Sequence, residues 1–280
     1  MLFFKAPLHC LRKNKAFRLL LNSKLNKPRF FETGLNHKIA LRPLIHTSIW
    51  LRRNKHEPVI RKLISKISKE LNQSKKNTWF FDVGANVGLY TWEVANICPN
   101  LKVMSFEPDP DNFELLKMTH SQSGSKNIKL CSYALSDRSA EAVFNQDKLT
   151  SATGSLSCEE KPWTEKYLNV STKKIKVQTN ILDTVVETDQ IPALIKIDVE
   201  GHEQEVIDGG TKTIEQFKPT MILESFPPIQ QKIIQTLDRI GYKIYDADRL
   251  SPVVGATQNL FAWHPKGPLK ESFFNNLLRS

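Results

Sequence analysis

A buried strand that runs into a glycine turn and a helix is the feature that most constrains the fold of this chain. The stretch from Trp79 to Trp92 reads W-F-F-D-V-G-A-N-V-G-L-Y-T-W, an apolar run followed by two glycines. Gly84 allows a tight turn, and Gly88 allows a ligand to approach the helix start. The free N–H groups of a helix start favour an anionic ligand group, whereas the Asp82 carboxylate suits a cationic amine. Together they indicate a cofactor that resembles an amino acid.

The segments after this motif alternate between strands and helices. A second strand is expected at Leu101–Phe106, a helix at about 113–121 after the capping sequence D-P-D-N, and a third strand at Asn127–Tyr133. Strands that recur roughly 25 residues apart, with helices between them, are typical of a parallel, doubly wound sheet. The predicted fold class is therefore α/β. The later expected strands are 194–199, 220–224, 242–245 and 259–263, and the later expected helices lie around 206–207, 228–240 and 273–278.

A segment in the middle of the chain departs from this alternation. Polar and apolar residues alternate in Glu141–Gln146 and in Lys174–Thr179, which predicts two half-exposed antiparallel strands. Residues 147–170 between them are polar and long for a structureless loop, and such segments are often lids. The alternative is a surface excursion with a small apolar cluster around Trp163. The sequence thus predicts an inserted β-hairpin, with the lid left as one of two interpretations.

The positive charge of the chain is confined to its N-terminal part. The 280 residues have a net charge of +11, but residues 1–56 hold 13 Lys and Arg and one acid, Glu32, so the remaining 27 basic and 28 acidic residues nearly balance. This distribution predicts a basic N-terminal extension (1–56), a domain (57–265) that starts with an amphipathic helix at 58–72, and a C-terminal tail (266–280). The near-neutral domain argues against a nucleic-acid partner.

The basic extension admits three interpretations. It has no apolar run of about 18 residues, so neither a transmembrane helix nor a secretory signal is expected. It could contact an anionic membrane or an acidic partner, act as a mitochondrial-type presequence, or have no specific partner. The expected location is therefore cytoplasmic, with peripheral membrane contact or a mitochondrial location as alternatives. The scattered cysteines fit a reducing compartment and indicate neither zinc nor a disulfide framework; they are Cys10, Cys98, Cys131 and Cys158.

A carboxylate at the end of the second strand indicates that the cofactor contains a nucleoside. Glu107 follows Gly88 by 19 positions, where an acid in dinucleotide-binding folds accepts the ribose hydroxyls. The run D-V-G-A-N-V-G differs from the G-x-G-x-x-G of NAD sites, and the chain has no P-loop motif for ATP. Because Asp82 suits the ammonium of a methionine moiety, S-adenosylmethionine is the preferred cofactor.

Four motifs in this order resemble the FkbM-type S-adenosylmethionine-dependent methyltransferases. They are D-V-G-A-N-V-G, F-E-P, A-L-S-D at Ala134–Asp137, and K-I-D-V-E-G-H-E at Lys196–Glu203. The resemblance covers about residues 78–226. It implies a class I methyltransferase (Rossmann-like) fold, with a seven-stranded, mostly parallel sheet whose last strand is antiparallel. It also implies methylation of a hydroxyl oxygen on a sugar, glycolipid or secondary metabolite.

The resemblance also assigns the site residues. The methionine part of the cofactor would be surrounded by Asp82, Gly84, Asn86 and Gly88. Glu107 would hold the ribose, and Tyr133 and Ala134 would lie near the adenine. Asp198, at the carboxyl end of the fourth strand, would lie at the reaction centre, where open α/β sheets bind ligands.

Methylation of an alcohol requires a base that removes the hydroxyl proton. The candidates are Asp198, Glu200 and His202, and His202 has the ordinary pKa best matched to a base near neutral pH. His202 could instead bond a backbone carbonyl at the start of a helix, and Glu200 and Glu203 could stabilise that start by their charge. Asp198, Glu200 and His202 could also bind a divalent metal, although nothing in the sequence requires one. Two other functions stay open: an NAD-dependent oxidoreductase and a noncatalytic module. The expected partner is a small-molecule or glycan acceptor.

Overall fold

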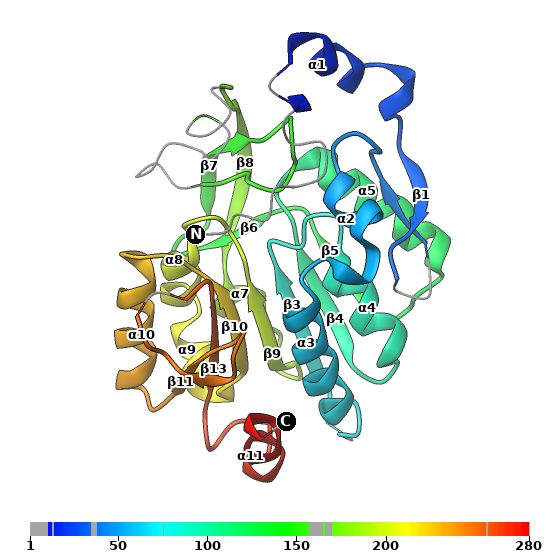
Figure 1. The fold of residues 1–280 in the computed structure, drawn as a ribbon. Helices are drawn as coiled ribbons and strands as arrows, with labels where there is room; N and C mark the ends of the chain where they lie inside the picture. The colour runs from blue at the N-terminus through cyan, green and yellow to red at the C-terminus, as the bar shows by residue number, and fades with distance from the viewer. Residues whose placement is uncertain are drawn as a thin grey trace.

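A mixed, mostly parallel β-sheet forms the centre of the protein (Figure 1). The computed structural model describes residues 11–12, 14–34, 38–74, 76–156, 165, 170–255 and 257–279. Within these residues the sheet has eight strands in the order β12-β11-β13-β10-β9-β3-β4-β5. The strands are β3 (Thr78–Val83), β4 (Lys102–Phe106), β5 (Ile128–Cys131), β9 (Ile191–Ile197), β10 (Thr220–Glu224), β11 (Lys243–Asp246), β12 (Ser251–Pro252) and β13 (Asn259–Trp263).

The strand directions confirm the class I methyltransferase fold. Strands β5, β4, β3, β9 and β10 pair in parallel, whereas β13, the last strand of the chain, is antiparallel to both β10 and β11. The only addition to the expected seven strands in the described part of the chain is β12, which contributes two residues at the edge. All carboxyl ends of the parallel strands therefore lie along one edge of the sheet.

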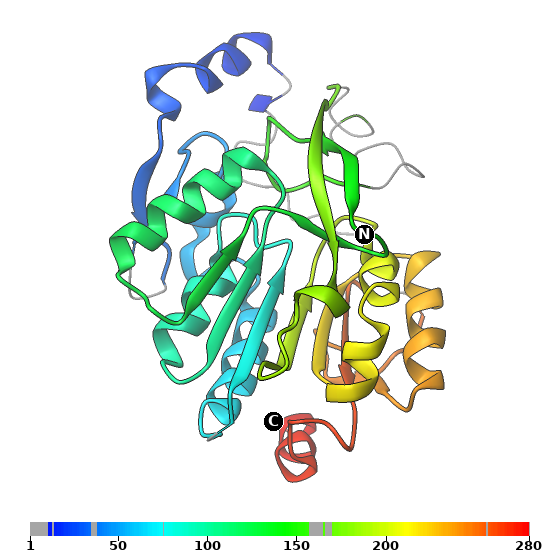
Figure 2. The ribbon, with the colours of Figure 1, turned by 180° about the vertical axis from the view of Figure 1, so that it is seen from behind.

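Helices cover both faces of the sheet because its strands are buried on both sides. Along β3, Phe80 faces one apolar core and the next residue, Phe81, faces the other. The first core receives α3 (Pro58–Leu71), α4 (Leu89–Ile97), α5 (Pro110–Ser123) and α11 (Glu271–Leu278). The second receives α7 (Leu182–Val185), α8 (Glu203–Asp208), α9 (Thr211–Phe217) and α10 (Ile229–Arg239), which lie in front in Figure 2.

The predicted β-hairpin is confirmed and belongs to a small second sheet. Strands β7 (Ala140–Gln146) and β8 (Lys173–Ile181) pair antiparallel, and β6 (Ala134–Ser136) pairs in parallel with β8. Residues 157–164 and 166–169 lie outside the described residues, and so does the expected apolar cluster around Trp163. The hairpin and helix α1 (Lys15–Leu21) lie at one end of the molecule, opposite α11 (Figures 1 and 2).

The second half of the expected basic extension packs into the domain. Strand β2 (Lys38–Leu41) pairs with β1 (Arg29–Glu32), and Ile39, Ala40 and Leu41 are fully buried in the first core. The Ala40 N–H donates to Thr119 Oγ1 of α5 at 2.9 Å. The net charge of residues 1–56 gives no sign of this packing, because three uncharged residues do not alter it. The other elements here are η2 (Lys24–Asn26), α2 (Thr47–Arg52) and η3 (Arg53–Lys55).

The C-terminal tail also packs on the domain. Phe274 of α11 stacks on Trp263 of β13, with ring centroids 3.9 Å apart.

The expected domain boundary between residues 56 and 57 stays a prediction. Among the described residues, no helix combines the length and apolar character needed to cross a membrane.

Candidate active site

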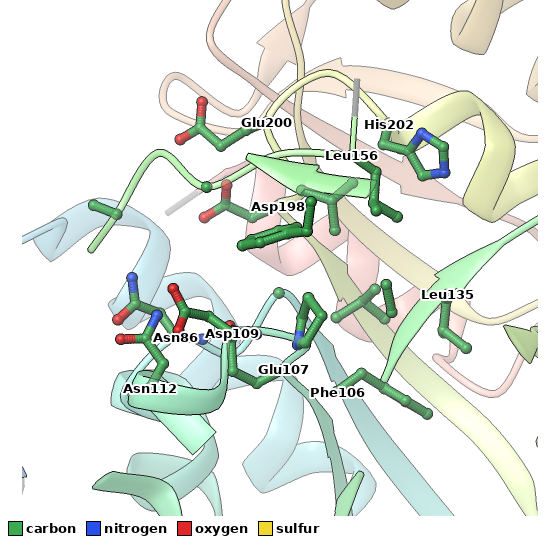
Figure 3. Close-up of a pocket in the computed structure, with 18 of the residues that line it drawn as sticks. Asn86, Phe106, Glu107, Asp109, Asn112, Leu135, Leu156, Asp198, Glu200 and His202 are labelled. Atoms are coloured by element: carbon green, nitrogen blue, oxygen red, sulfur yellow. Dashed lines mark hydrogen bonds between the residues drawn. The ribbon is translucent and has the colours of Figure 1, made fainter. Parts of the chain in front are cut away.

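The carboxyl ends of β3, β4 and β9 border a cavity of about 660 Å³ that opens to solvent (Figure 3). The cavity lies at the edge where open α/β sheets bind ligands. The sequence-predicted residues that line it are Gly84, Asn86, Glu107, Ala134, Asp198, Glu200 and His202. Asp82, Gly88 and Tyr133 are not part of the lining.

Gly84 lets the loop after β3 lie directly against the end of β9. Its φ is +77°, and a Cβ atom there would lie 1.9 Å from the backbone oxygen of Asp198. The Gly84 N–H also donates to the Phe106 carbonyl at the end of β4, at 3.0 Å. A side chain at Gly84 would therefore push apart the ends of β3 and β9, which together border the cavity.

Gly88 is a packing position, and its expected place beside the methionine part of the cofactor stays a prediction. It is the N-cap of α4 with a φ of +83°, and a Cβ atom would lie 2.5 Å from Trp92 Nε1 and 2.6 Å from Leu116 Cδ2. The lack of a side chain thus allows α4 to pack against α5, and Gly88 does not border the cavity. The spacing of the two glycines could not distinguish close packing from close approach of a ligand.

Asp82 is buried behind the cavity lining, where it holds the start of α4. Its side chain is fully buried, and its Oδ2 accepts hydrogen bonds from the Thr91 N–H (3.0 Å) and the Thr91 hydroxyl (2.7 Å). Burial raises the pKa of this carboxyl. Asp82 also pairs with Lys196 in the register of β3 and β9. The predicted contact with a cofactor ammonium stays a prediction, whereas the support of α4 and of Lys196 is part of the fold.

Glu107 lies in the cavity with its carboxyl group held by the backbone. Its Oε2 accepts the Asn86 N–H at 2.7 Å, and its Oε1 accepts the Asp109 N–H at 2.9 Å. The pKa of Glu107 is raised to about 8, first by burial and then by the neighbouring Asp109 carboxylate. Each carboxyl oxygen has a second lone pair, so two vicinal hydroxyls can still bind. The geometry therefore suits the predicted ribose contact.

An apolar wall lies beside Glu107. Phe106, Ala134 and Leu135 line the cavity there, and Figure 3 shows Phe106 and Leu135 on one side of it. Tyr133 packs against the Phe106 ring, with centroids 5.8 Å apart. Tyr133 therefore supports the wall that was expected to meet the adenine, and Ala134 forms part of that wall.

Asp198 is paired with a buried lysine that the sequence reasoning did not assign. Lys196 Nζ donates to Asp198 Oδ2 at 2.9 Å, and the Lys196 side chain is only 7% exposed. Burial alone would favour the neutral amine, but attraction by Asp198, Asp82 and Glu57 outweighs it and raises the pKa of Lys196. Side chains two apart on a strand share a face, so the K-x-D spacing was a usable signal for this pair.

Glu200 and His202 occupy different parts of the cavity. In Figure 3 the Glu200 carboxyl lies on the side of Asp198, whereas the His202 ring lies beside Leu156 at the other end. Burial and then the Asp198 carboxylate raise the pKa of Glu200 well above its ordinary value, which favours the protonated acid. Glu200 also has a left-handed φ of +55°.

The His202 ring is held by a hydrogen bond from one nitrogen, and its other nitrogen lies near Glu205 without a proton to donate. Its Nε2 lies 2.9 Å from Ser136 Oγ, and its Nδ1 lies 3.5 Å from Glu205 Oε2. The single hydroxyl proton of Ser136 is donated to Asp137 Oδ1, so the Nε2–H of His202 is the donor to Ser136. Burial lowers the pKa of His202, and the ring is therefore neutral near pH 7. These contacts turn the ring toward β6 and α8.

Residues 147–156 form one wall of the cavity, although nothing in their sequence identified them individually. The Ser151 carbonyl accepts from Asn86 Nδ2 (2.7 Å) and from Asn112 Nδ2 (3.1 Å). The Ser155 hydroxyl donates to the Glu200 carbonyl at 2.8 Å. The segment is thus tied to three elements that surround the cavity, which is consistent with the lid interpretation.

The family is decided by a comparison with protein-family models. The model of the methyltransferase FkbM domain matches residues 82–244, more than half of the chain. The chain belongs to the FkbM methyltransferase family. The matched range contains Asp82, the cavity-lining residues named above, and the Lys196–Asp198 pair.

The individual proteins that resemble this chain share at most about a third of their residues with it in the aligned regions. The hexuronic acid methyltransferase AglP of Haloferax volcanii is 30% identical over 148 residues, which cover 52% of this chain and 55% of AglP. The chain therefore spans about half the length of this curated relative. A methyltransferase FkbM from Methylobacillus flagellatus KT has 14% identity and a TM-score of 0.46, covering 76% of this chain and 52% of that one. An S-adenosylmethionine-dependent O-methyltransferase from Thermotoga maritima has 14% identity and a TM-score of 0.41, with 72% and 64% covered.

Proposed function

We propose that this FkbM-family chain is an S-adenosylmethionine-dependent methyltransferase that methylates a hydroxyl oxygen of a glycan or small-molecule acceptor. Family membership supports a methyltransferase, and the resemblance to a hexuronic acid methyltransferase supports a sugar acceptor. The observation that carries the proposal is that Gly84, Glu107 and Asp198 converge in one cavity from three strand ends.

The residues of the cavity fit S-adenosylmethionine. Glu107 would bind the ribose hydroxyls, and Phe106, Ala134 and Leu135 would contact the adenine. Asn86 lines the cavity, and its buried Oδ1 has no hydrogen-bond partner among the described residues, so it would accept from the ammonium of the methionine part. When bound, the cofactor supplies a methyl group on a positively charged sulfur.

Asp198 is the base that the geometry favours. It lines the cavity and is partly exposed, and its ion pair with Lys196 keeps the carboxylate in place. Glu200 favours the protonated form, and the Nε2–H of His202 is donated to Ser136, which turns the ring toward β6. Asp198 would therefore accept the hydroxyl proton during attack on the methyl group. Among the described residues, no group of three or more His, Cys, Asp or Glu could hold a metal ion.

The test combines cofactor binding with methyl transfer. Calorimetry should show binding of S-adenosylmethionine and S-adenosylhomocysteine, and Glu107→Ala should weaken it by about 2 kcal/mol. Glu114→Ala, an exposed acid on α5, is the matched control. In a screen of hydroxyl acceptors with a labelled methyl group, Asp198→Asn should lower the rate at least about 100-fold, whereas the exposed Asp238→Asn should not.

The same measurements decide between the competing functions. Tighter binding of NAD than of S-adenosylmethionine would support an oxidoreductase instead. Cofactor binding without transfer to any acceptor of a broad panel would support a noncatalytic module.

We also propose a cytoplasmic protein whose basic N-terminal part contacts an anionic membrane surface. Cys98 and Cys131 are free thiols, in keeping with a reducing compartment. Helix α1 has no buried residue, and Leu19 and Leu25 are 75% and 57% exposed beside Lys15 and Lys24. Exposed leucines among basic residues suit the interface of an anionic bilayer.

A further inference from the structure

The carboxylate of Glu57 lies at the start of α3 but does not cap that helix. Glu57 has a left-handed φ of +44°, and its side chain makes no hydrogen bond to the first turn of α3. Instead, the Tyr90 hydroxyl of α4 donates to Glu57 Oε2. A left-handed conformation is uncommon for a residue with a side chain and persists where surrounding contacts hold it. The turn before α3 therefore directs a carboxylate toward α4.

Arg61 holds this turn against α4 by two hydrogen bonds. Its Nη1 donates to the Arg53 carbonyl at 3.1 Å, and its Nε donates to Glu93 Oε2 of α4 at 2.8 Å. The Arg61 side chain is buried between the two elements that it joins. Glu57 and Tyr90 are therefore kept opposite each other by contacts that do not depend on their own hydrogen bond.

The ring of Tyr90 lies against the ammonium group of Lys196. Lys196 Nζ is 4.8 Å from the centre of the ring, and it donates to Asp198 Oδ2 at 2.9 Å. The face of an aromatic ring attracts a cation, and a hydroxyl that donates to a carboxylate polarises the ring further. The ammonium is therefore attracted in two directions, toward Asp198 in the candidate active site and toward Tyr90 with Glu57 behind it.

Two other acids near this lysine are largely uncharged at neutral pH. Burial, followed by repulsion from Asp198 and Glu57, raises the pKa of Glu224 to about 8. Burial and then Asp198 raise the pKa of Glu200 well above its ordinary value. On the side of α3 and α4, Glu57 is thus the carboxylate that shares Lys196 with Asp198. The titratable groups that face Lys196 are Glu57, Asp82, Tyr90, Asp198 and Glu224, and Asp198 also faces His56, Glu200 and Glu203.

We propose that Glu57 is a positioning residue of the active site, which acts on Asp198 through Tyr90 and Lys196. The proposal rests on the methyltransferase function proposed above. Because the Lys196 ammonium is shared, it orients the Asp198 carboxylate without fully neutralising it. A carboxylate that had this ammonium to itself would accept a proton less readily. Glu57 precedes the matched FkbM range of residues 82–244, so the N-terminal part of this chain supplies support for the active site.

The same arrangement leaves negative charge beside the position of a cationic methyl donor. Reacting atoms approach to about 3 Å, and a base acts within about 3 Å of the group that it deprotonates, so the sulfonium of S-adenosylmethionine would lie close to Asp198. S-adenosylhomocysteine lacks the methyl group and the positive charge. The ratio of the two dissociation constants therefore measures the charge balance of Glu57, Lys196 and Asp198, and no acceptor is needed.

The experiment measures both dissociation constants by calorimetry with the full-length protein at neutral pH. Glu57→Gln removes one negative charge, so it should weaken binding of S-adenosylmethionine about threefold and change that of S-adenosylhomocysteine less than about 1.5-fold. Tyr90→Phe should change the ratio in the same direction, and Lys196→Met should change it about threefold in the opposite direction. The matched controls should leave the ratio unchanged. They are Glu70→Gln, at the other end of α3, and Tyr242→Phe, whose hydroxyl has no hydrogen-bond partner among the described residues.

The pH dependence of kcat gives a second measurement with an acceptor found in the screen described above. Glu57→Gln should lower kcat about threefold and move the acid limb of the profile to lower pH, because Asp198 then accepts a proton less readily. Lys196→Met should move that limb to higher pH. The KM of the acceptor should change less than about twofold in Glu57→Gln, since Glu57 acts on the base.

Two results would overturn the positioning role. One is equal weakening of S-adenosylmethionine and S-adenosylhomocysteine binding in Glu57→Gln, which would make the contact between Glu57 and Tyr90 a packing contact of α3 with α4. The other is a ratio that stays unchanged or moves in the opposite direction in Glu57→Gln and Tyr90→Phe. These two variants decide the matter even if Lys196→Met does not fold. A wild-type protein that binds neither ligand would instead contradict the proposed methyltransferase function.

Discussion

Single residues at the strand ends decide how closely the walls of the cavity approach one another. Asn86, Ser151 and Glu200 have φ values of +53°, +57° and +55°, and all three line the cavity. Such conformations are costly for residues with side chains and persist where surrounding contacts determine them. Gly84 represents the extreme case, because here a side chain has no space at all.

Gly84→Ala should destabilise the protein far more than an alanine at another left-handed glycine. Gly124 has a φ of +63°, and a Cβ atom there would have no neighbour within 4 Å, so Gly124→Ala should cost about 1 kcal/mol from backbone strain alone. At Gly84 the clash with the Asp198 carbonyl adds to this strain, and we expect a loss of about 3 kcal/mol or more. Urea unfolding of both variants measures the difference. Equal losses would show that β9 can move away from the turn freely.

The raised pKa of Glu107 predicts a pH dependence of stability. An acid whose pKa in the folded state is about 8, against an ordinary value of 4.5, binds its proton more tightly when folded. The free energy of unfolding should therefore fall as the pH rises from about 5 to about 8, because only the unfolded chain releases this proton readily. Glu203 and Glu224, with pKa values raised to about 7 and about 8, act in the same direction.

Glu107→Gln should make this decline less steep, since the variant has no proton to release at that position. Denaturant unfolding at several pH values between 5 and 8 tests this. A decline as steep in Glu107→Gln as in the wild-type protein would contradict a raised pKa at Glu107.

At the scale of elements, the segment 147–156 joins the small sheet to the cavity. Two side-chain amides, from Asn86 and Asn112, hold the Ser151 carbonyl, and the Ser151 hydroxyl donates to Asn112 Oδ1. Asn112 is therefore bonded in both directions to this segment. Asp147 and a β-bridge between Asn145 and Ser155 hold other parts of the segment, so the Asn112 bonds hold the part around Ser151 that lines the cavity.

Asn112→Ala should loosen the segment without unfolding the domain. Removal of its two hydrogen bonds to Ser151 should speed amide hydrogen exchange in 147–156 by about tenfold. Exchange in β3 and β9, at the centre of the sheet, should not change. Gln231→Ala, an exposed residue on α10, is the control. Unchanged exchange in 147–156 would show that other contacts hold this wall.

For the whole molecule, the position of the N-terminal part has a functional consequence. Arg12 donates to the Ile45 carbonyl at 2.7 Å and to Thr47 Oγ1 at 3.0 Å, and it interacts electrostatically with Asp147. Helix α1 therefore lies near the segment that borders the cavity, at the same end of the molecule as the β7–β8 hairpin (Figure 1). A membrane bound through α1 would lie on the side of that segment.

The triple variant Leu19→Ser, Leu20→Ser and Leu25→Ser should bind vesicles that contain phosphatidylserine at least about tenfold more weakly than the wild-type protein, since each leucine contributes apolar area. Binding of the wild-type protein should also weaken at high salt. Val254→Ser, which changes an 86% exposed residue elsewhere, is the control for vesicle co-sedimentation. Two results would contradict membrane contact through α1: no detectable vesicle binding by the wild-type protein, or equally tight binding by the triple variant. Point variants are preferable to deletion of residues 1–50, which would remove the buried Ile39–Leu41.

The sequence by itself determined the order and type of the elements, because their signals are local. The apolar run before Gly84 predicted β3, and Asp109 with Pro110 predicted the start of α5, where Asp109 is the N-cap. The helix expected directly after the glycine turn is α4, Leu89–Ile97. Alternation of polarity was sufficient to predict the β7–β8 hairpin. The ordered motifs also indicated the FkbM family, which the match to residues 82–244 confirms.

Only the tertiary structure decided which of these residues meet in space. A residue at a strand end can point into a cavity or into the core, and that choice depends on what packs on each face. Asp82 therefore became a buried partner of Thr91 while Glu107, at a similar strand end, entered the cavity. Lys196 likewise meets Glu57, Tyr90, Glu224 and Gln258, which come from four other segments. No local pattern encodes that grouping, because it arises when the sheet and its helices bury their apolar faces together.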